Sequence, residues 1–253
     1  MSRTDRRGFL RMLLAAGLGA GAFRLLQPSE LQALIRQERL RWGFLVDTYR
    51  CVGCGLCVRA CKLENEVPYE APVTRTWVER YVLLKDGSVL ADTPMGARDG
   101  FTQMRTMGRD VKAQDILKAF FVPKLCNQCD KPPCVQVCPV GATYRTADGV
   151  VLVDRKWCIG CGYCIMACPY GVRFFHPVYR VAEKCNFCYH RLHRGMKTAC
   201  VDACPFGARK VGNLRDPRDE VTRVITTQRV AVLKDEFGTK PQVFYLGLDE
   251  MVR

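Results

Sequence analysis

One short segment near the middle of the chain determines its architecture: Cys158-Ile159-Gly160-Cys161-Gly162-Tyr163-Cys164-Ile165-Met166-Ala167-Cys168-Pro169. Its four cysteines are separated by two, two and three residues. The same spacing recurs at Cys51, Cys54, Cys57 and Cys61. Two further quartets widen only the middle gap, to four and eleven residues: Cys126, Cys129, Cys134, Cys138 and Cys185, Cys188, Cys200, Cys204. All 16 cysteines of the chain fall into these quartets, so we expect them to act in sets of four.

Three of the quartets close with the same phrase, which makes the chain an internal repeat: Cys138-Pro139-Val140-Gly141-Ala142, Cys168-Pro169-Tyr170-Gly171-Val172 and Cys204-Pro205-Phe206-Gly207-Ala208. In two-cluster bacterial ferredoxins this spacing places three cysteines around one [4Fe-4S] cluster, while the fourth, just before Pro, ligates the neighbouring cluster. The quartets therefore predict four [4Fe-4S] clusters, bound in pairs by the sixteen cysteines.

Two other uses of cysteine compete with this interpretation. An exported chain with an even cysteine count can be a disulfide framework, but 253 residues that are 48% hydrophobic can bury a core without disulfides. Zinc ribbons also use C-x-x-C pairs, but they do not add the third and fourth thiolates and the following Pro. The pattern favours iron-sulfur clusters over both.

The N-terminus has the pattern of an export signal. Thr4-Asp5-Arg6-Arg7-Gly8-Phe9-Leu10-Arg11 precedes an uncharged run over 12–23, which is shorter than the roughly 20 residues that span a bilayer. Adjacent arginines followed by an apolar run are typical of a twin-arginine signal, whose route carries folded, cofactor-loaded proteins. We predict a twin-arginine-type signal peptide over 1–28 and a location in the periplasm or at the outer face of the cytoplasmic membrane. An ordinary secretory signal and a basic membrane-surface helix are the alternatives, and an uncleaved segment would act as a membrane anchor.

The basic excess of the sequence offsets the charge of the expected clusters. Residues 1–22 carry four Arg and one Asp, so their removal lowers the formal charge from +14 to +11. Each oxidised cubane with four thiolates adds roughly −2, which brings the loaded chain to roughly +3. Since little basic surface remains, we expect no nucleic-acid partner.

The rest of the chain predicts an α+β fold of two ferredoxin-like halves. We expect a helix over 29–41, a strand over 42–46, hairpins around Asp86-Gly87 and Asp148-Gly149, a helix from Asp216-Pro217 to about Gln228, and a last strand over 243–246. The first half comprises 42–65 and 180–215, with the first and fourth quartets. The second comprises 126–179, with the other two. Residues 66–125 form a surface insertion, and 216–253 form a C-terminal extension.

Three features resemble one protein family over residues 42–250: the order of the quartets, the eleven-residue gap, and Cys61-Lys62-Leu63-Glu64-Asn65. They resemble the iron-sulfur electron-transfer subunit of the dimethyl sulfoxide reductase family of complex molybdoenzymes. The exported branch, with the subunits of tetrathionate, polysulfide and arsenate reductases, is most similar. Val243-Phe244-Tyr245-Leu246-Gly247-Leu248-Asp249 resembles the tetrathionate type.

The resemblance implies four ligand sets, which we number as sites 1 to 4. Site 1 takes Cys51, Cys54, Cys57 and Cys204, and site 4 takes Cys61, Cys185, Cys188 and Cys200. Site 2 takes Cys126, Cys129, Cys134 and Cys168, and site 3 takes Cys138, Cys158, Cys161 and Cys164. The family's order from catalytic subunit to membrane is 1, 4, 2, 3, with site 3 facing the quinone. Nitrate reductase relatives have Trp and a three-iron cluster where this chain has Cys161, so four cubanes are expected.

The resemblance also implies a non-catalytic role. The leading hypothesis is a relay of electrons between an integral-membrane quinone-reactive subunit and an exported molybdopterin oxidoreductase of sulfur or arsenic oxyanions. An alternative keeps the membrane subunit but replaces molybdenum with multihaem cytochrome or sulfite-reductase-linked iron-sulfur partners. A third is a free periplasmic ferredoxin. In the first two, membrane association comes through a partner or through the uncleaved N-terminus.

Other side chains are weaker candidates. His176, His190 and His193 are the histidines of the chain, and lone histidines in basic loops usually face solvent rather than bind metal or relay protons. Trp157 and Tyr163 flank the third quartet, and we expect them to shield its cluster from water. The chain contains no Gly-rich phosphate loop, nucleophile elbow or paired acid and base, so no catalytic residue is predicted.

Overall fold

The computed structural model describes residues 40–101, 105–106 and 109–252. The predicted signal peptide and nearly all of the predicted helix over 29–41 lie outside these residues. The described chain combines short helices with small sheets, which confirms the mixed α and β content of the predicted fold. Within it, no helix is long and apolar enough to cross a bilayer.

A four-stranded sheet contains the first strand of the described chain, in the order β11-β1-β13-β12. Strand β1 (Trp42–Asp47) lies between antiparallel β11 (Arg209–Asn213) and parallel β13 (Val243–Leu246). Strand β12 (Val230–Ala231) pairs with the outer side of β13. The middle residues of β1 are all buried, because this central strand is covered on both faces. The strands predicted over 42–46 and 243–246 are therefore confirmed.

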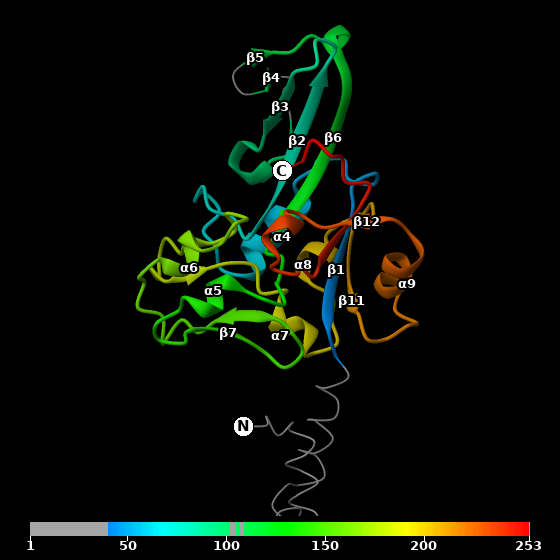
Figure 1. The fold of residues 1–253 in the computed structure, drawn as a ribbon. Coiled ribbons are helices and arrows are strands. Elements are labelled where there is room, and N and C mark those ends of the chain that lie inside the picture. The colour runs from blue at the N-terminus through cyan, green and yellow to red at the C-terminus, as the bar shows by residue number, and fades with distance from the viewer. Residues whose placement is uncertain (1–39, 102–104, 107–108, 253) are drawn as a thin grey trace, which may run out of the picture. The chain divides into compact units, whose positions relative to one another are not determined.

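Helix α9 (Glu220–Thr227) lies beside β11 (Figure 1) and corrects the sequence prediction, which began this helix at Asp216-Pro217. The Asp219 carboxylate accepts hydrogen bonds from the backbone N–H groups of Val221 and Asn213, each at 2.8 Å. Asp219 is therefore the N-cap of the helix. Asp216 instead accepts the backbone N–H of Arg218 at 2.9 Å, which closes a turn before the helix begins.

A three-stranded antiparallel sheet, in the order β3-β2-β6, lies in the upper part of Figure 1. Its strands are β2 (Thr76–Leu84), β3 (Val89–Asp92) and β6 (Ile116–Leu125), and the hairpin predicted around Asp86-Gly87 joins the first two. Four short elements follow β3 along the chain: η1 (Pro94–Ala97), β4 (Arg105–Thr106), β5 (Arg109–Asp110) and η2 (Ala113–Asp115). Strand β6 ends directly before Cys126, so the sheet leads into the second quartet.

Short helices accompany the cysteine loops: α4 (Leu56–Glu64), α5 (Pro133–Gln136), α6 (Tyr163–Met166), α7 (Tyr189–Leu192) and α8 (Ala199–Asp202). Helices α4 and α6 follow glycines in the left-handed region, Gly55 at φ 77° and Gly162 at φ 80°. A Cβ at Gly55 would lie 2.2 Å from the carbonyl oxygen of Ala97, so only glycine fits there. The elements not yet named are two strand pairs and a short 3-10 helix. Strand β7 (Thr143–Arg145) pairs with β8 (Val151–Val153), and β9 (Phe174–Phe175) pairs with β10 (Ala182–Glu183). The 3-10 helix is η3 (Asp235–Phe237). The β7–β8 pair is the hairpin predicted around Asp148-Gly149.

Two groups of buried side chains form the core. The larger joins both main sheets to cysteines of the first, second and fourth quartets, and it includes Phe44, Val58, Val78, Val122 and Phe187. The smaller lies near the second and third quartets and consists of Cys134, Val151, Cys164 and Ala182. Half of the members of this smaller group are cysteines, so few aliphatic or aromatic side chains pack beneath the cysteine loops of the second and third quartets. The predicted boundaries of the two halves, the insertion and the C-terminal extension stay predictions.

Candidate metal centres

Site 1 gathers cysteines from two distant parts of the chain. Cys51, Cys54, Cys57 and Cys204 line one cavity. The first three come from the loop before α4 and from α4 itself, and the last closes the fourth quartet. The side chain of Arg209, on β11, forms part of the wall. The structure thus brings together the same four thiols that the family resemblance assigns to one site.

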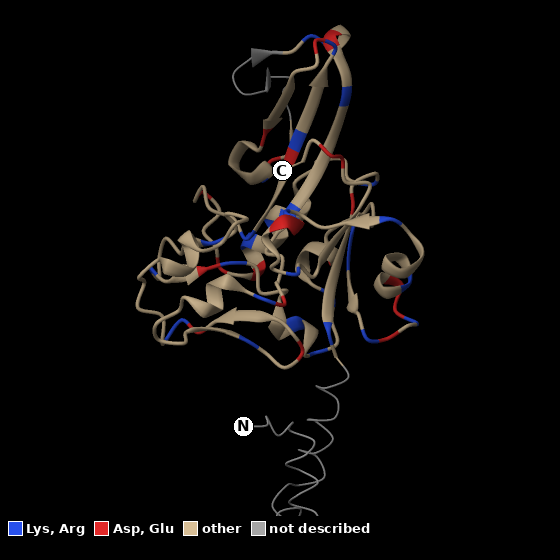
Figure 2. Ribbon diagram, viewed as in Figure 1, with Lys and Arg blue, Asp and Glu red and all other residues tan. Residues whose placement is uncertain are grey.

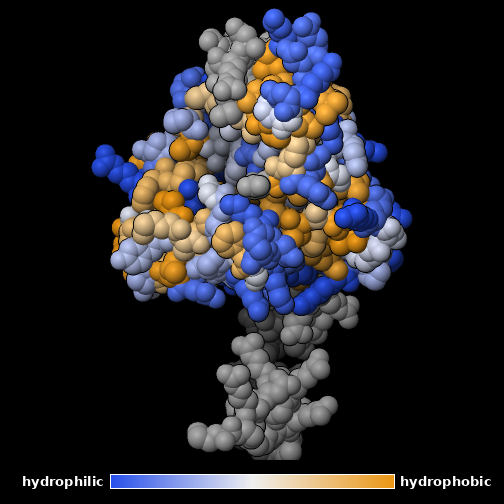
Figure 3. All heavy atoms as spheres, turned by 45° about the horizontal axis from the view of Figure 1, so that its top comes forward, coloured by the Kyte–Doolittle hydropathy of each residue, from blue (hydrophilic) through white to orange (hydrophobic). Residues whose placement is uncertain are grey.

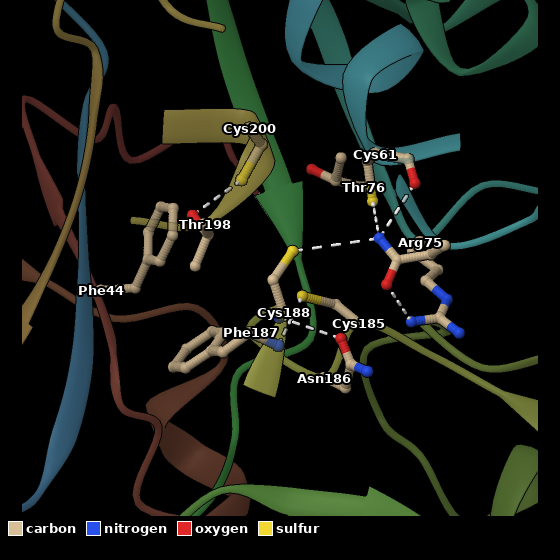
Figure 4. A pocket seen from close by; sticks show the side chains of 11 residues that line it. Phe44, Cys61, Arg75, Thr76, Cys185, Asn186, Phe187, Cys188, Thr198 and Cys200 are labelled. Carbon is tan, nitrogen blue, oxygen red and sulfur yellow. Dashed lines mark hydrogen bonds between the residues drawn. The ribbon is translucent and has the colours of Figure 1, made fainter. Parts of the chain in front are cut away.

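Site 4 has the reciprocal arrangement. Cys61, in the last turn of α4, lines one cavity with Cys185, Cys188 and Cys200. Figure 4 shows their sulfur atoms turned toward a common space. The side-chain amide of Asn65 donates to Cys61 Sγ at 3.6 Å and to Cys188 Sγ at 3.9 Å, and the backbone N–H of Phe187 donates to Cys185 Sγ at 3.4 Å. Such donors stabilise thiolate and cluster sulfur.

Site 2 has the same arrangement, with three cysteines from the second quartet and one from the third. Cys126, Cys129 and Cys134 line one cavity with Cys168, the closing cysteine of the third quartet. The guanidinium of Arg173 donates to Cys134 Sγ at 3.1 Å. Three of the four ligand sets implied by the resemblance therefore each surround one cavity.

Site 3 is the most open of the four. Cys164 is buried beside Cys134, with Cys158 packed against them. Cys138 is half-buried, and its Sγ accepts the backbone N–H of Thr143 at 3.4 Å. Cys161 is exposed to solvent. The structure encloses this set less completely than the others.

Burial raises the pKa of several of these thiols, so it disfavours the thiolate in the absence of iron. It raises the pKa of Cys57 to about 11, and that of Cys129 and Cys185 to about 12. Burial also acts to raise the pKa of Cys138, but backbone N–H groups, led by that of Thr143, outweigh it and lower the pKa. Bound iron favours the thiolate strongly enough to overcome such penalties, so loading of these sites releases protons.

The donor sets fit [4Fe-4S] clusters, which are held by four thiolates and tuned by hydrogen bonds to sulfur. All 16 cysteines are free thiols, so the fold does not use them as the disulfide framework considered above. Across the described ranges, no three His, Cys, Asp or Glu side chains are placed to hold a single metal ion. When bound, the clusters would supply one-electron redox centres, and the chain supplies thiolates, N–H donors and exclusion of water.

Several polar side chains to which the sequence assigned no role contact these sites, among them Asn65, Arg173 and Arg209. The signal that could have found the arginines is the repeat itself, because both follow a closing cysteine at the same distance.

Figure 2 shows that Lys and Arg are spread over many elements of the described chain and interleaved with Asp and Glu. Arg173 and Arg209 are buried beside thiols, so part of the basic excess lies where counter-charges for the clusters are expected.

One expectation about an individual residue was wrong. His176 does not face solvent but is only 1% exposed, and its Nδ1 accepts the backbone N–H groups of Val178 and Tyr179, each at 3.2 Å. Trp157 and Tyr163 are 67% and 55% exposed, and their shielding of the site 3 cluster stays a prediction. His190 and His193 instead lie near carboxylates, those of Glu64 and Asp148.

Trp157 and Tyr163 belong to an exposed apolar patch on the cysteine loop and helix of the third quartet. Its members are Trp157, Ile159, Tyr163 and Met166, and Met166 is 75% exposed. Figure 3 shows apolar surface on the side of the molecule that carries α6 in Figure 1. Exposed apolar patches of this kind mark interaction surfaces.

Comparison with known proteins agrees with this geometry. Residues 50–142 and 117–214 each match 4Fe-4S dicluster domains. The chain is 38% identical to the B subunit of tetrathionate reductase from Salmonella typhimurium over 252 residues, which cover 98% of this chain and 90% of that protein. The protein belongs to the iron-sulfur subunits of the dimethyl sulfoxide reductase family.

Two further relatives support this membership. The protein is 33% identical to the B subunit of selenate reductase from Mesobacillus selenatarsenatis, over 96% of its own length and 97% of that relative. It is 35% identical to the B polypeptide of polysulfide reductase from Wolinella succinogenes, over 81% of its own length and 93% of that relative. Like the other iron-sulfur subunits of the family, it transfers electrons and is not itself catalytic.

Proposed function

We propose that this subunit holds four [4Fe-4S] clusters and relays single electrons between an integral-membrane quinone-reactive subunit and an exported molybdopterin oxidoreductase of sulfur or arsenic oxyanions. The observation that carries the proposal is the crossed lining of the cavities. Three cysteines of the first quartet share a cavity with the last cysteine of the fourth, and the last cysteine of the first shares one with the other three of the fourth. The names of the tetrathionate and polysulfide reductase relatives support the substrate class.

The order of the sites supports a relay along one line. Arg209 lies beside thiols of sites 1 and 4, and Cys185 of site 4 interacts electrostatically with Cys126 of site 2. The side-chain amide of Gln128, from the second quartet, donates to the carbonyl oxygen of Cys185 at 2.7 Å. Arg173 then lies beside thiols of sites 2 and 3. These contacts support the proposed order of neighbouring sites, 1, 4, 2, 3.

Sites 1 and 3, at the two ends of the proposed relay, both lie beside exposed apolar side chains. Such side chains suit a subunit that binds one partner at each end. At site 3 these belong to the patch of Trp157, Ile159, Tyr163 and Met166, and we assign this face to the quinone-reactive subunit. At site 1 they are Tyr49, Val52 and Phe206, of which Tyr49 is 80% exposed. We assign this second face to the catalytic subunit.

The proposed location is the periplasm or the outer face of the cytoplasmic membrane, reached by the twin-arginine route. The motif around Arg6 and Arg7 supports it, since that route carries proteins with their cofactors already bound. In this proposal the subunit associates with the membrane through its partner or through an uncleaved N-terminus.

Purification of the native complex through a tag on this subunit tests the function. We expect molybdenum, iron for the clusters, and a large pterin-binding subunit together with an integral-membrane subunit. Haem without molybdenum would contradict this proposal and favour the quinone-linked complex with cytochrome partners. A soluble monomer without partners would favour the free ferredoxin.

Replacement of the exposed ligand gives a prediction specific to site 3. Cys161→Ser is expected to convert only the site 3 cluster, toward a three-iron form with a raised midpoint potential, because one iron loses its thiolate. EPR spectra during a redox titration measure the change, and Cys54→Ser is the matched control that should alter only the site 1 cluster. EPR spectra of the Cys161→Ser complex that match those of the unmodified complex would refute the assignment of Cys161.

A further inference from the structure

Two arginines occupy the same position in two copies of the repeat. Arg173 is the fifth residue after Cys168, and Arg209 is the fifth after Cys204, in the segments Cys168-Pro169-Tyr170-Gly171-Val172-Arg173 and Cys204-Pro205-Phe206-Gly207-Ala208-Arg209. Both side chains are deeply buried, with residue exposures of 5% and 2%. Burial of a guanidinium is costly unless nearby groups compensate its charge. The repeated position therefore indicates a purpose linked to the cysteine loops.

Arg173 lies between sites 2 and 3. Its Nη2 donates to Cys134 Sγ of site 2 at 3.1 Å, and its Nη1 lies 3.4 Å from the hydroxyl of Thr143. Burial acts to lower the pKa of Arg173, but Cys134 and Cys126 of site 2 and Cys164 of site 3 outweigh it and raise the pKa. One buried cation thus faces thiols of both sites.

Arg209 has the equivalent place between sites 1 and 4. It lies in the wall of the site 1 cavity, and its Nη1 donates to the hydroxyl of Thr76 at 2.8 Å. Its pKa is raised because Cys57 and Cys51 of site 1 and Cys200 of site 4 together outweigh its burial. Its Nη2 is buried and has no hydrogen-bond partner in the described part of the subunit.

Neither arginine contacts a carboxylate among the residues that the structure describes. This distinguishes them from buried Arg75, whose charge is paired with Glu183 at 2.7 Å. The groups that face Arg173 and Arg209 are thiols and hydroxyls, so their counter-charge has to come from thiolates and the anionic clusters that these hold. A cation buried in a medium of low dielectric acts on each of two neighbouring anions much more strongly than it would in water.

We propose that Arg173 and Arg209 are charge bridges, each placed between two neighbouring clusters, which raise the midpoint potentials of both. The charge stabilises the reduced, more negative state of each cluster, and a hydrogen bond to sulfur acts in the same direction. It also weakens the repulsion between two neighbouring clusters when both are reduced. The inference rests on the proposed binding of four clusters.

Glutamine variants in the tagged native complex test this role, with EPR-monitored redox titration as the readout. In R173Q we expect the midpoint potentials of the site 2 and site 3 clusters to fall while those of sites 1 and 4 stay unchanged. In R209Q we expect the reverse, so each variant is the control for the other. Full iron content with four unchanged potentials in both variants would overturn the proposal.

Lysine variants keep the test decisive if a glutamine variant loses iron. Lysine retains the charge, but it is shorter than arginine and has no fork that can contact two sites at once. R173K is therefore expected to load all clusters and to lower the potential of at least one cluster at sites 2 and 3. Unchanged potentials at both sites in R173K would overturn the bridge. Failure of the four-cluster proposal itself is distinguished by the unmodified complex, which would then contain less iron than four cubanes require.

Discussion

Anaerobic removal of iron from the purified subunit is expected to unfold the segment of the second and third quartets before the four-stranded sheet. The small core beside these quartets consists of Cys134, Val151, Cys164 and Ala182, and the segment adds only Cys126, Val150 and Val172 to the buried side chains of the larger core. The segment therefore has little apolar area to hold its loops when the metal is gone. By contrast, the sheet around β1 rests on the larger core with Phe44 and Val46. Binding of a structural metal contributes on the order of 10 kcal/mol to folding in small metal-dependent domains, and we expect a comparable dependence here.

Hydrogen exchange with mass spectrometry measures this difference. Peptides from 126–183 should lose nearly all their protection in the iron-free subunit, while peptides from β1 and β13 should keep part of theirs. Reconstitution with iron and sulfide under the same conditions is the control and should restore the protection of 126–183. Equal protection of that segment with and without iron would show that its fold does not depend on the clusters.

Local signals in the sequence predicted much of the fold. Asp-Gly pairs between apolar runs predicted both hairpins, since few residues other than glycine adopt the left-handed backbone that these turns need. The start of α9 was misplaced because Asp216 and Asp219 are both suitable caps. Only the register of β11 decides between them, by presenting the backbone N–H of Asn213 to Asp219. That register depends on pairing with β1, which lies far away in the sequence.

The roles of side chains around the sites were harder to predict. Spacing predicted clusters in pairs, but the exposure of Trp157 and Tyr163 depends on how the loop of the third quartet sits on the fold. Flanking aromatic residues look alike in sequence whether they cover a cluster or contact a partner. His176 is buried because two backbone N–H groups and a neighbouring carbonyl compensate its polar atoms, and no sequence motif encodes these partners.

The buried ion pair of Arg75 and Glu183 links strand β10 to the surroundings of the site 4 cysteines. Arg75 donates to Glu183 and to the side-chain oxygen of Asn65, each at 2.7 Å, and Asn65 in turn donates to the sulfur atoms of Cys61 and Cys188. Glu183 ends β10, two residues before Cys185. Both ionic side chains are nearly inaccessible, with exposures of 4% for Arg75 and 6% for Glu183.

Glu183→Ala is therefore expected to lower the free energy of unfolding of the loaded subunit by about 3–5 kcal/mol, because it removes the carboxylate that pairs with buried Arg75 and with partly exposed Arg155, each at 2.7 Å. Anaerobic denaturant titration, followed by circular dichroism and by cluster absorbance, measures the loss. Lys118→Ala is the matched control, since it breaks an ion pair with Asp249 of 2.6 Å whose lysine is 53% exposed. Such a surface pair contributes at most about 1 kcal/mol. A loss in Glu183→Ala no larger than in Lys118→Ala would mean that Arg75 is compensated without Glu183. A normal EPR signal of site 4 in Glu183→Ala would separate this effect on stability from a direct effect on the ligands.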